Sequence, residues 1–223
     1  MNNFLFGIYP YIAFTIFALG SLIRYDREPY TWKSSSSQLL ESKKLRLGSA
    51  PFHIGIIAVL CGHFVGLLTP HAVWHVLGVS AEVKQLIAMS AGGFFGVVCL
   101  FGLVVLIQRR LTNERVRATS STMDISILFL LLAQLVLGLM SIFVSADHMD
   151  GHEMLLLMAW AQNVVIFNGA YAAEQMQSVH LIFKLHVFLG MTLFVVFPFS
   201  RLVHIWSAPL KYINRNYQVV RQR

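Results

Sequence analysis

The chain alternates long apolar runs with short polar connections, a pattern that predicts helices crossing a membrane. Each of five runs is long enough to span a hydrocarbon core of about 30 Å: they cover residues 4–23, 52–68, 85–107, 123–144 and 181–207. A sixth run, 154–167, has only about 14 residues, so we expect a helix at the outer membrane surface. The pattern therefore predicts an all-α membrane protein with five transmembrane helices, forming a single domain over residues 1–223.

Lysine and arginine gather in alternate connections. Of 17 such residues, six lie between the first and second runs, four between the third and fourth, and five from Arg201 onward, which leaves only Lys84 and Lys184 for the opposite side. Because cytoplasmic loops are enriched in Lys and Arg, we expect the N-terminus outside, in the periplasm, and the C-terminus in the cytoplasm. The basic cytoplasmic tail, at about 208–223, suits anionic lipid or an acidic protein partner, and we expect no nucleic acid.

Composition narrows the class further. The chain is 57% hydrophobic and 12% charged, which excludes an ordinary soluble globule. Cys61 and Cys99 each lie within an apolar run, so neither a disulfide framework nor a thiolate metal site is indicated. No C-x-x-C-H motif occurs, so any haem would be bound non-covalently. No basic region precedes the first run, which we interpret as a span and not a cleaved signal.

Four histidines lie in two of the predicted helices, His53 and His63 in the second, His186 and His204 in the fifth. If 181–207 is one helix, His186 and His204 lie five turns apart, on one face and about 27 Å from each other. Counting depth at about 1.5 Å per residue pairs His63 with His186 and His53 with His204. His53 and His63 are only about 15 Å apart, so tilted helices or slanted haem planes are expected.

Such pairs favour iron porphyrins. Two axial imidazoles fill the coordination shell of iron, which suits electron transfer better than oxygen binding. Neutral imidazole also enters lipid at lower cost than a charge. A lone histidine in a membrane helix is more often a hydrogen bond or a proton relay, but four at matched depths favour two haems. Gly62, Gly66 and Gly190 lie near these histidines and suit either a flat macrocycle or close helix packing.

Six segments, spread over essentially the whole chain, carry a resemblance to a known family: IRYDREPYTW, HIGIIAVLCGHFVGLLTPH, EVKQ, RVRATS, DHMDG and LHVFLGMTLFVVFPFSRLVHIWS. They resemble the cytochrome b (gamma) subunit of membrane-bound respiratory nitrate reductase. The resemblance implies five spans and two haems b. It implies a distal haem near the outer face held by His63 and His186, and a proximal haem near the cytoplasm held by His53 and His204. One departure is Lys184, where arginine is expected before Leu-His.

The resemblance also implies a quinol site near the distal haem, formed by Lys84 with Gly62 and His63. Lys84 opens the third run on the outer side and could hydrogen-bond a quinol oxygen; a lysine that merely snorkels to the interface is the alternative. The implied cytoplasmic partners are an iron-sulfur (beta) subunit and a molybdenum-containing catalytic (alpha) subunit. Nitrate reduction would take place on those partners. The complex would lie in the bacterial inner membrane and draw on its quinol pool.

Weaker features and other interpretations stay open. His148 and His152 could share a helix face and bind a metal, although their polar surroundings indicate a solvated loop. Three arginines, Arg109, Arg110 and Arg201, could pair with haem propionates or serve only as cytoplasmic flanks. The chain could instead be a cytochrome b subunit of hydrogenase or formate dehydrogenase type. A histidine-relay proton channel or transporter without haem is the other alternative, against which the absence of inverted repeats argues.

Overall fold

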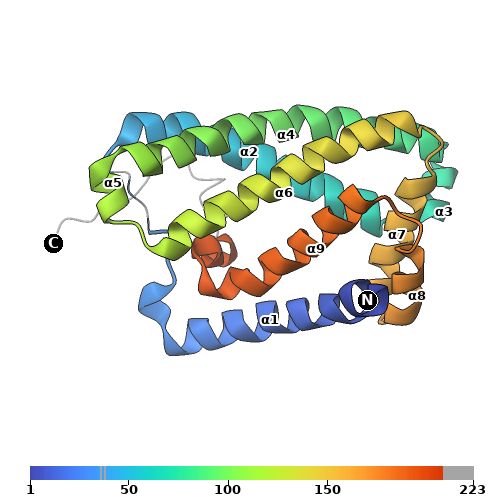
Figure 1. Cartoon of the computed structure of the whole chain (residues 1–223), viewed down its shortest axis with the longest axis horizontal. Coiled ribbons are helices and arrows are strands. Elements are labelled where there is room, and N and C mark those ends of the chain that lie inside the picture. Colours follow the sequence, from blue (N-terminus) through green and yellow to red (C-terminus); the bar gives the residue numbers. More distant parts are fainter. Residues whose placement is uncertain (36, 38, 208–223) are drawn as a thin grey trace.

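A computed structural model of the chain describes residues 1–35, 37 and 39–207; the predicted basic tail at 208–223 lies outside these residues. The described part is helical and contains no strand. Long helices run side by side along the molecule, and short helices close its ends (Figure 1). The prediction of five spans is confirmed, because five helical segments are long and apolar enough to cross a membrane: Asn3–Arg27, Ser42–Leu68, Ala81–Thr112, Thr122–Asp147 and Leu181–Phe199.

The elements follow one another in this order: η1 (Asn3–Ile8), α1 (Tyr9–Arg27), η2 (Pro29–Thr31), α2 (Ser42–Leu68), α3 (His71–Val76), α4 (Ala81–Thr112), α5 (Glu114–Ala118), α6 (Thr122–Asp147), α7 (His152–Val165), α8 (Gly169–Gln175), α9 (Leu181–Val196), η3 (Phe197–Phe199) and η4 (Arg201–Ser207). Serine side chains cap two of the long helices. The Ser80 hydroxyl accepts from the amide of Val83 before α4, and Ser121 forms a reciprocal capping box with Asp124 at the start of α6.

The prediction that 181–207 is a single helix is wrong. α9 ends at Val196, a short 3-10 turn follows, and Ser200 is extended at φ −115° and ψ 178°. Pro198 has no amide hydrogen and cannot continue an α-helix without losing a hydrogen bond. A guanidinium nitrogen of Arg24 in α1 donates to the carbonyls of Pro198 (2.7 Å) and Ser200 (2.9 Å). His204 therefore lies on the separate η4, and the predicted 27 Å spacing along one helix does not hold.

A proline within α2 does not end the helix. This helix begins at Ser42, well before the predicted start of the span at Phe52, and it continues through Pro51. Neighbouring groups in membrane proteins commonly compensate for the hydrogen bond that an internal proline removes. The polar stretch before Pro51 is thus helical, and it extends α2 beyond its apolar part.

α2 and α4 approach each other at glycine positions. A Cβ atom placed on Gly102 would lie 2.3 Å from the backbone nitrogen of Phe52 and 2.6 Å from the carbonyl oxygen of Gly48. A Cβ on Gly55 would lie 2.6 Å from Cys99. Small residues at such a crossing let two membrane helices pack backbone to backbone. α2, which carries His53 and His63, is therefore held directly against α4.

The short apolar run 154–167 forms α7, which lies with α8 and α3 at one end of the bundle (Figure 1). α7 is not among the five candidate spans, as predicted. Its Trp160 donates the indole N–H to the carbonyl of Phe6 at 3.0 Å. This end holds a buried apolar cluster, whose members are Phe6, Trp160, Ala161, Val164, Ala172, Met176, Val179 and Phe183.

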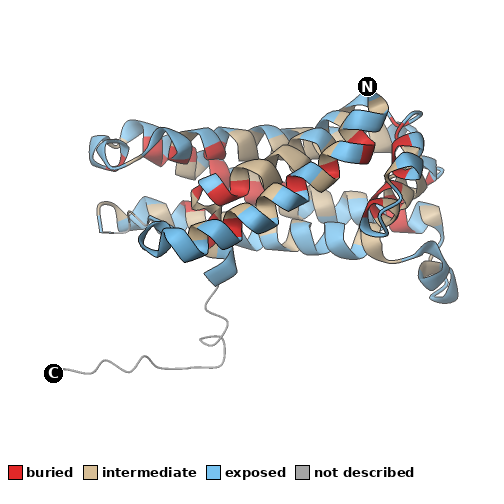
Figure 2. Cartoon of the chain, turned by 90° about the horizontal axis from the view of Figure 1, so that it is seen from below, coloured by how far each residue is buried: buried red, intermediate tan, exposed pale blue. Residues whose placement is uncertain are grey.

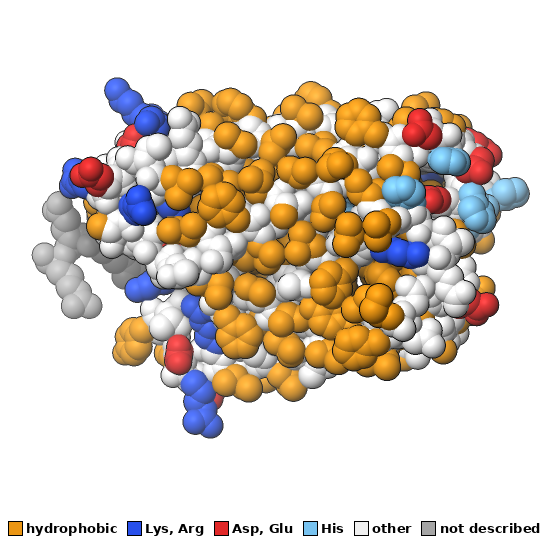
Figure 3. Space-filling view, viewed as in Figure 1, with side chains coloured by type: hydrophobic (Ala, Val, Ile, Leu, Met, Phe, Trp, Pro, Cys, Tyr) orange, Lys and Arg blue, Asp and Glu red, His pale blue; other side chains and the backbone are white. Residues whose placement is uncertain are grey.

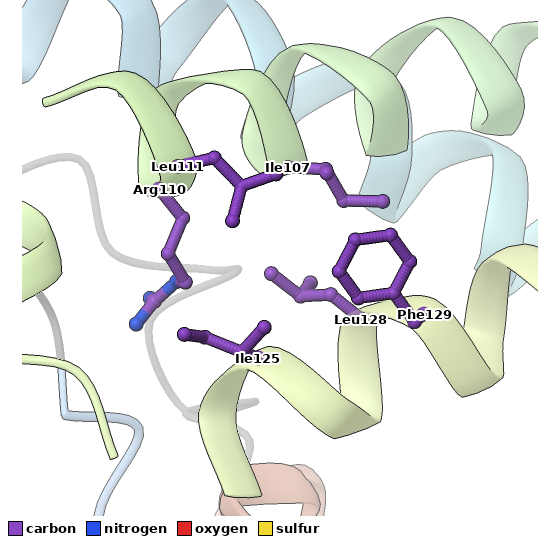
Figure 4. A pocket seen from close by; sticks show the side chains of 6 residues that line it. All are labelled: Ile107, Arg110, Leu111, Ile125, Leu128 and Phe129. Carbon is purple, nitrogen blue, oxygen red and sulfur yellow. The ribbon is translucent and has the colours of Figure 1, made fainter. Parts of the chain in front are cut away.

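A smaller buried cluster lies between α4 and α6 toward the other end, formed by Leu103, Ile107 and Leu128. Buried residues are few along the middle of the bundle, where most helix faces are half-buried or exposed (Figure 2). A small hollow beside this cluster is nearly all apolar (Figure 4), with Ile107, Arg110, Leu111, Ile125, Leu128 and Phe129 around it.

The two ends of the bundle differ in charge. Lysine and arginine side chains gather at the end that carries α5 (Figure 3). The opposite end, around α3 and α7, carries histidines and acidic side chains (Figure 3). The wide apolar belt between them matches the surface that lipid tails would cover. The alternation of basic connections along the sequence thus becomes a basic end and a less basic end.

Candidate functional site

Two of the four histidines meet near the end that carries α3 and α7. The ring centres of His63 in α2 and His186 in α9 lie 6.0 Å apart. The Nδ1 atom of His63 is 2.8 Å from the carbonyl oxygen of Val59, and that of His186 is 3.1 Å from the carbonyl oxygen of Gln134 in α6. His63 is exposed and His186 is half-buried.

The other two histidines meet toward the basic end. The ring centres of His53 in α2 and His204 in η4 lie 6.4 Å apart. The Nδ1 atom of His53 is 2.7 Å from the carbonyl oxygen of Ser49, and that of His204 is 2.6 Å from the carbonyl oxygen of Arg201. The structure therefore brings together the same two pairs that the depth count gives, although His204 reaches its partner from a separate 3-10 segment.

All four imidazoles share one arrangement that suits metal binding. A ring that donates its Nδ1 hydrogen to a carbonyl turns the lone pair of Nε2 away from that carbonyl, and metal-bound histidines are commonly oriented in this way. The Nε2 atom of His186 lies 3.4 Å from the side-chain amide nitrogen of Gln134, a long contact that a bound metal would have to displace. A metal between two rings, with bonds of about 2 Å and about 1 Å from each nitrogen to its ring centre, separates the centres by about 6 Å. The observed 6.0 and 6.4 Å fit this value, so each pair can hold one haem iron.

Within residues 1–35, 37 and 39–207, no group of three or more His, Cys, Asp or Glu side chains could hold a metal ion. The possibility that His148 and His152 share a helix face is wrong. His148 follows the last residue of α6 and His152 begins α7, with Gly151 at φ 73° between them.

Lys84 is enclosed near the first histidine pair. Its ammonium donates to the carbonyl of Gly66 at 2.6 Å and to the sulfur of Met158 at 2.7 Å, and it lies 4.9 Å from the centre of the Trp74 ring. Lys84 is only 4% exposed, so the alternative of a lysine that snorkels into solvent does not apply. Gly66 lies three residues beyond His63 on α2, so the ammonium is bound about one helical turn along α2 from that histidine.

A cation in this position can serve a polar ligand. Among the described residues, no carboxylate forms an ion pair with Lys84, so its charge is matched only by a carbonyl, a thioether and an aromatic face. A Cβ atom on Gly62 would meet nothing within 4 Å, which leaves open space beside His63. This space adjoins His63, whereas the ammonium of Lys84 is enclosed, so an oxygen atom can accept a hydrogen bond from it only when one of its neighbours moves.

The family model described as the nitrate reductase gamma subunit matches residues 2–223. The chain belongs to the nitrate reductase gamma subunit family. It is 53% identical to the respiratory nitrate reductase 1 gamma chain of Escherichia coli K12 and 51% identical to the gamma chain of nitrate reductase 2 from that strain; each alignment covers 100% of this chain and 98% of the relative. It is 41% identical to the nitrate reductase gamma chain of Bacillus subtilis 168, over 100% of this chain and 99% of the relative.

This membership confirms the resemblance carried by the sequence motifs. It favours a subunit of nitrate reductase over a cytochrome b subunit of hydrogenase or formate dehydrogenase type. The match covers the helices that bear all four histidines and Lys84, so the geometry above lies wholly within the gamma subunit family region.

The three arginines considered for haem propionates are engaged by protein groups. Arg109 donates to carbonyls and a hydroxyl in the α1–α2 connection, and Arg110 donates to the Ser120 hydroxyl. Arg201 lies 3.2 Å from a carboxylate oxygen of Asp124 and donates to carbonyls of the α1–α2 connection. Burial lowers the pKa of Arg201 and Asp124 raises it, and a guanidinium stays charged at neutral pH. These arginines hold η4 and the connections in place.

Several residues that contact the candidate site were not predicted from the sequence. The carbonyls that orient His53 and His63 belong to residues one turn earlier in α2, so the i, i−4 spacing could have pointed to Ser49 and Val59. Nothing in the sequence indicates that Gln134 of α6 meets His186, or that Trp74 lies over Lys84. Those contacts depend on how separate helices pack.

Proposed function

We propose that this chain is the membrane-anchoring electron-transfer subunit of a respiratory nitrate reductase, which oxidises quinol and passes electrons through two haems b to partner subunits. Membership of the gamma subunit family supports this assignment. The partners are an iron-sulfur beta subunit and a molybdenum-containing alpha subunit, which carries out nitrate reduction. Five helices long and apolar enough for a membrane support an anchor in the bacterial inner membrane.

The observation that carries the proposal is that four histidines meet in two pairs, His63 with His186 and His53 with His204. His63 and His186 would hold the distal haem, and His53 and His204 the proximal haem, because each pair combines a ring separation near 6 Å with Nδ1 held by a carbonyl. When bound in this way, haem iron takes up and releases single electrons without an open position for oxygen. The carbonyls fix ring orientation and increase the basicity of the ligating nitrogen.

Lys84 with Gly62 and His63 would form the quinol site. The ammonium can donate to a quinol oxygen and stabilise negative charge as the hydroxyl loses its proton. The Lys- and Arg-rich end of the molecule supports a cytoplasmic location for that end and an outer location for Lys84. Quinol oxidation would then release protons outside while electrons move inward, which separates charge across the membrane.

Haem content tests the first part of the proposal. Pyridine haemochrome and reduced-minus-oxidised spectra of the purified complex should give two non-covalent haems b per chain. His63→Ala and His186→Ala should remove the same spectral component, and His53→Ala and His204→Ala the other. The matched control, His148→Ala, changes an exposed loop histidine and should keep both haems. A folded preparation without haem would refute the proposal and favour a proton relay.

Reduction kinetics test the quinol site. Lys84→Ala should slow haem reduction by quinol about 10- to 100-fold, the effect of losing a charged hydrogen-bond donor, while both haems remain bound. Lys184→Ala is the control, because its ammonium lies at the same end of the bundle and donates to the carbonyl of Gln177. Equal reduction rates in the wild type and Lys84→Ala would refute this role of Lys84.

A further inference from the structure

The enclosure of Lys84 leaves no route for a quinol to its ammonium unless a neighbouring side chain moves. The carbonyl of Gly66 belongs to the backbone of α2, and Met158 belongs to α7, which is part of the buried cluster at this end of the molecule. Trp74 covers the remaining side, with its ring centre 4.9 Å from the ammonium. Of these neighbours, Trp74 is the one on a weakly held element.

That element, α3, has six residues, none of them buried. Pro70 precedes it, and Gly78 follows it at φ +71°, a conformation that glycine adopts without strain. Val73 and Val76 are 45% and 84% exposed, so they contribute little packing. α3 is thus a short, exposed helix between two turns, and its Trp74 contacts Lys84.

The indole nitrogen of Trp74 is buried and has no hydrogen-bond partner among the described residues. Other tryptophans of the chain satisfy this group: Trp160 donates to the carbonyl of Phe6 and Trp32 to the hydroxyl of Ser207. A tryptophan that merely anchors a membrane interface would turn its N–H toward water. A buried donor without a partner is unfavourable, and here it lies beside the proposed substrate site.

We propose that Trp74 is a substrate-contacting residue of the quinol site and that α3 is its cover. This inference rests on the proposed role of Lys84. Without substrate, the indole face lies on the ammonium as a cation–π contact. When a quinol head enters, α3 moves, Lys84 donates to an oxygen of the quinol, and the indole N–H donates to an oxygen of the same head. The ligand class is a hydroquinone, whose ring also stacks against the indole.

Trp74→Phe in the intact complex tests this inference, because phenylalanine keeps a smaller aromatic face over Lys84 and removes the N–H donor. The KM for a water-soluble quinol should rise about five- to tenfold, as expected for one lost hydrogen bond, while kcat stays within about twofold. The Kd of the corresponding quinone, measured by equilibrium titration of the oxidised complex, should rise by the same factor. Val76→Ala, an exposed change on the same helix, should alter neither value.

Haem content separates the two levels of the proposal. A Trp74→Phe complex with two haems that binds quinone as tightly as the wild type would overturn the role of Trp74 and leave the proposed function standing. A wild-type complex that contains no haem or binds no quinone would overturn the proposed function and this inference with it. A selective rise in KM and Kd at full haem content supports both.

Discussion

Gly102 lies where α4 and α2 approach most closely, and it offers a sharp test of how the histidine pairs are held. In Gly102→Ala, the new methyl group would lie 2.3 Å from the backbone nitrogen of Phe52, whereas ordinary contacts begin at 3.4 Å. Backbone atoms cannot rotate away as a side chain can, so the two helices must separate by about 1 Å.

The expected cost follows from that separation. Overpacking a close interface costs about 3 kcal/mol at the upper end of its usual range, and alanine regains about 1 kcal/mol over glycine within a helix, for a net destabilisation of about 2 kcal/mol. Phe52 directly precedes His53, so the shift displaces His53 by about 1 Å relative to His204. Since metal–imidazole bonds are only about 2 Å long, the proximal haem should be lost first.

Thermal unfolding in detergent and haem quantification measure both effects. The Tm of Gly102→Ala should fall by about 4–8 °C, and its haem content should drop below two per chain. Gly92→Ala is the matched control in the same helix, because a Cβ there meets nothing within 4 Å. The control should keep both haems and an unchanged or slightly higher Tm. Equal Tm and haem content in the two variants would refute the reasoning.

Two further variants test the supports of the site. Asp124→Asn leaves the half-buried Arg201 without its carboxylate, so the free energy of unfolding should fall by about 1–3 kcal/mol, between the values for exposed and buried ion pairs, and the proximal haem should be lost more readily. Asp147→Asn, exposed at the far end of α6, should match the wild type in thermal unfolding and haem content. Gln85→Ala removes three hydrogen bonds to the backbone around the α6–α7 connection, so amide hydrogen exchange there should quicken, whereas exposed Gln108→Ala should leave it unchanged. Unaltered amide hydrogen exchange in Gln85→Ala would contradict the role of Gln85 in holding the α6–α7 connection.

Hydrophobic length was sufficient to predict the five spans, and helix rise paired His63 with His186, because both depend on depth in the membrane. The pairing of His53 with His204 agrees with the structure, although the depth count assumed a continuous helix, whereas α9 ends at Val196. The break after α9 was not predictable in the same way. Pro198 ends its helix and Pro51 does not. What distinguishes them is packing, since Arg24 of α1 binds the carbonyls freed near Pro198 from 174 positions away.

In the candidate site, too, the sequence points to the residues but not to the contacts that depend on helix packing. Lys84 came from the family resemblance, which can name a residue but not its surroundings. Its enclosure by Trp74 and Met158 depends on a short helix and on α7, neither of which was expected to touch it. The roles of the histidines in haem binding and of Lys84 in quinol oxidation remain predictions for the experiments above.

His53 and His63 stand ten residues apart on one helix, which corresponds to a rise of about 15 Å. Glycine contacts hold this helix backbone to backbone against α4. Under the proposed function, one axial ligand of each haem would therefore come from a single helix that is packed tightly against its neighbour, which fixes the spacing of these two ligands. Substrate entry through a moving α3 could then be gated at one end without changing that spacing.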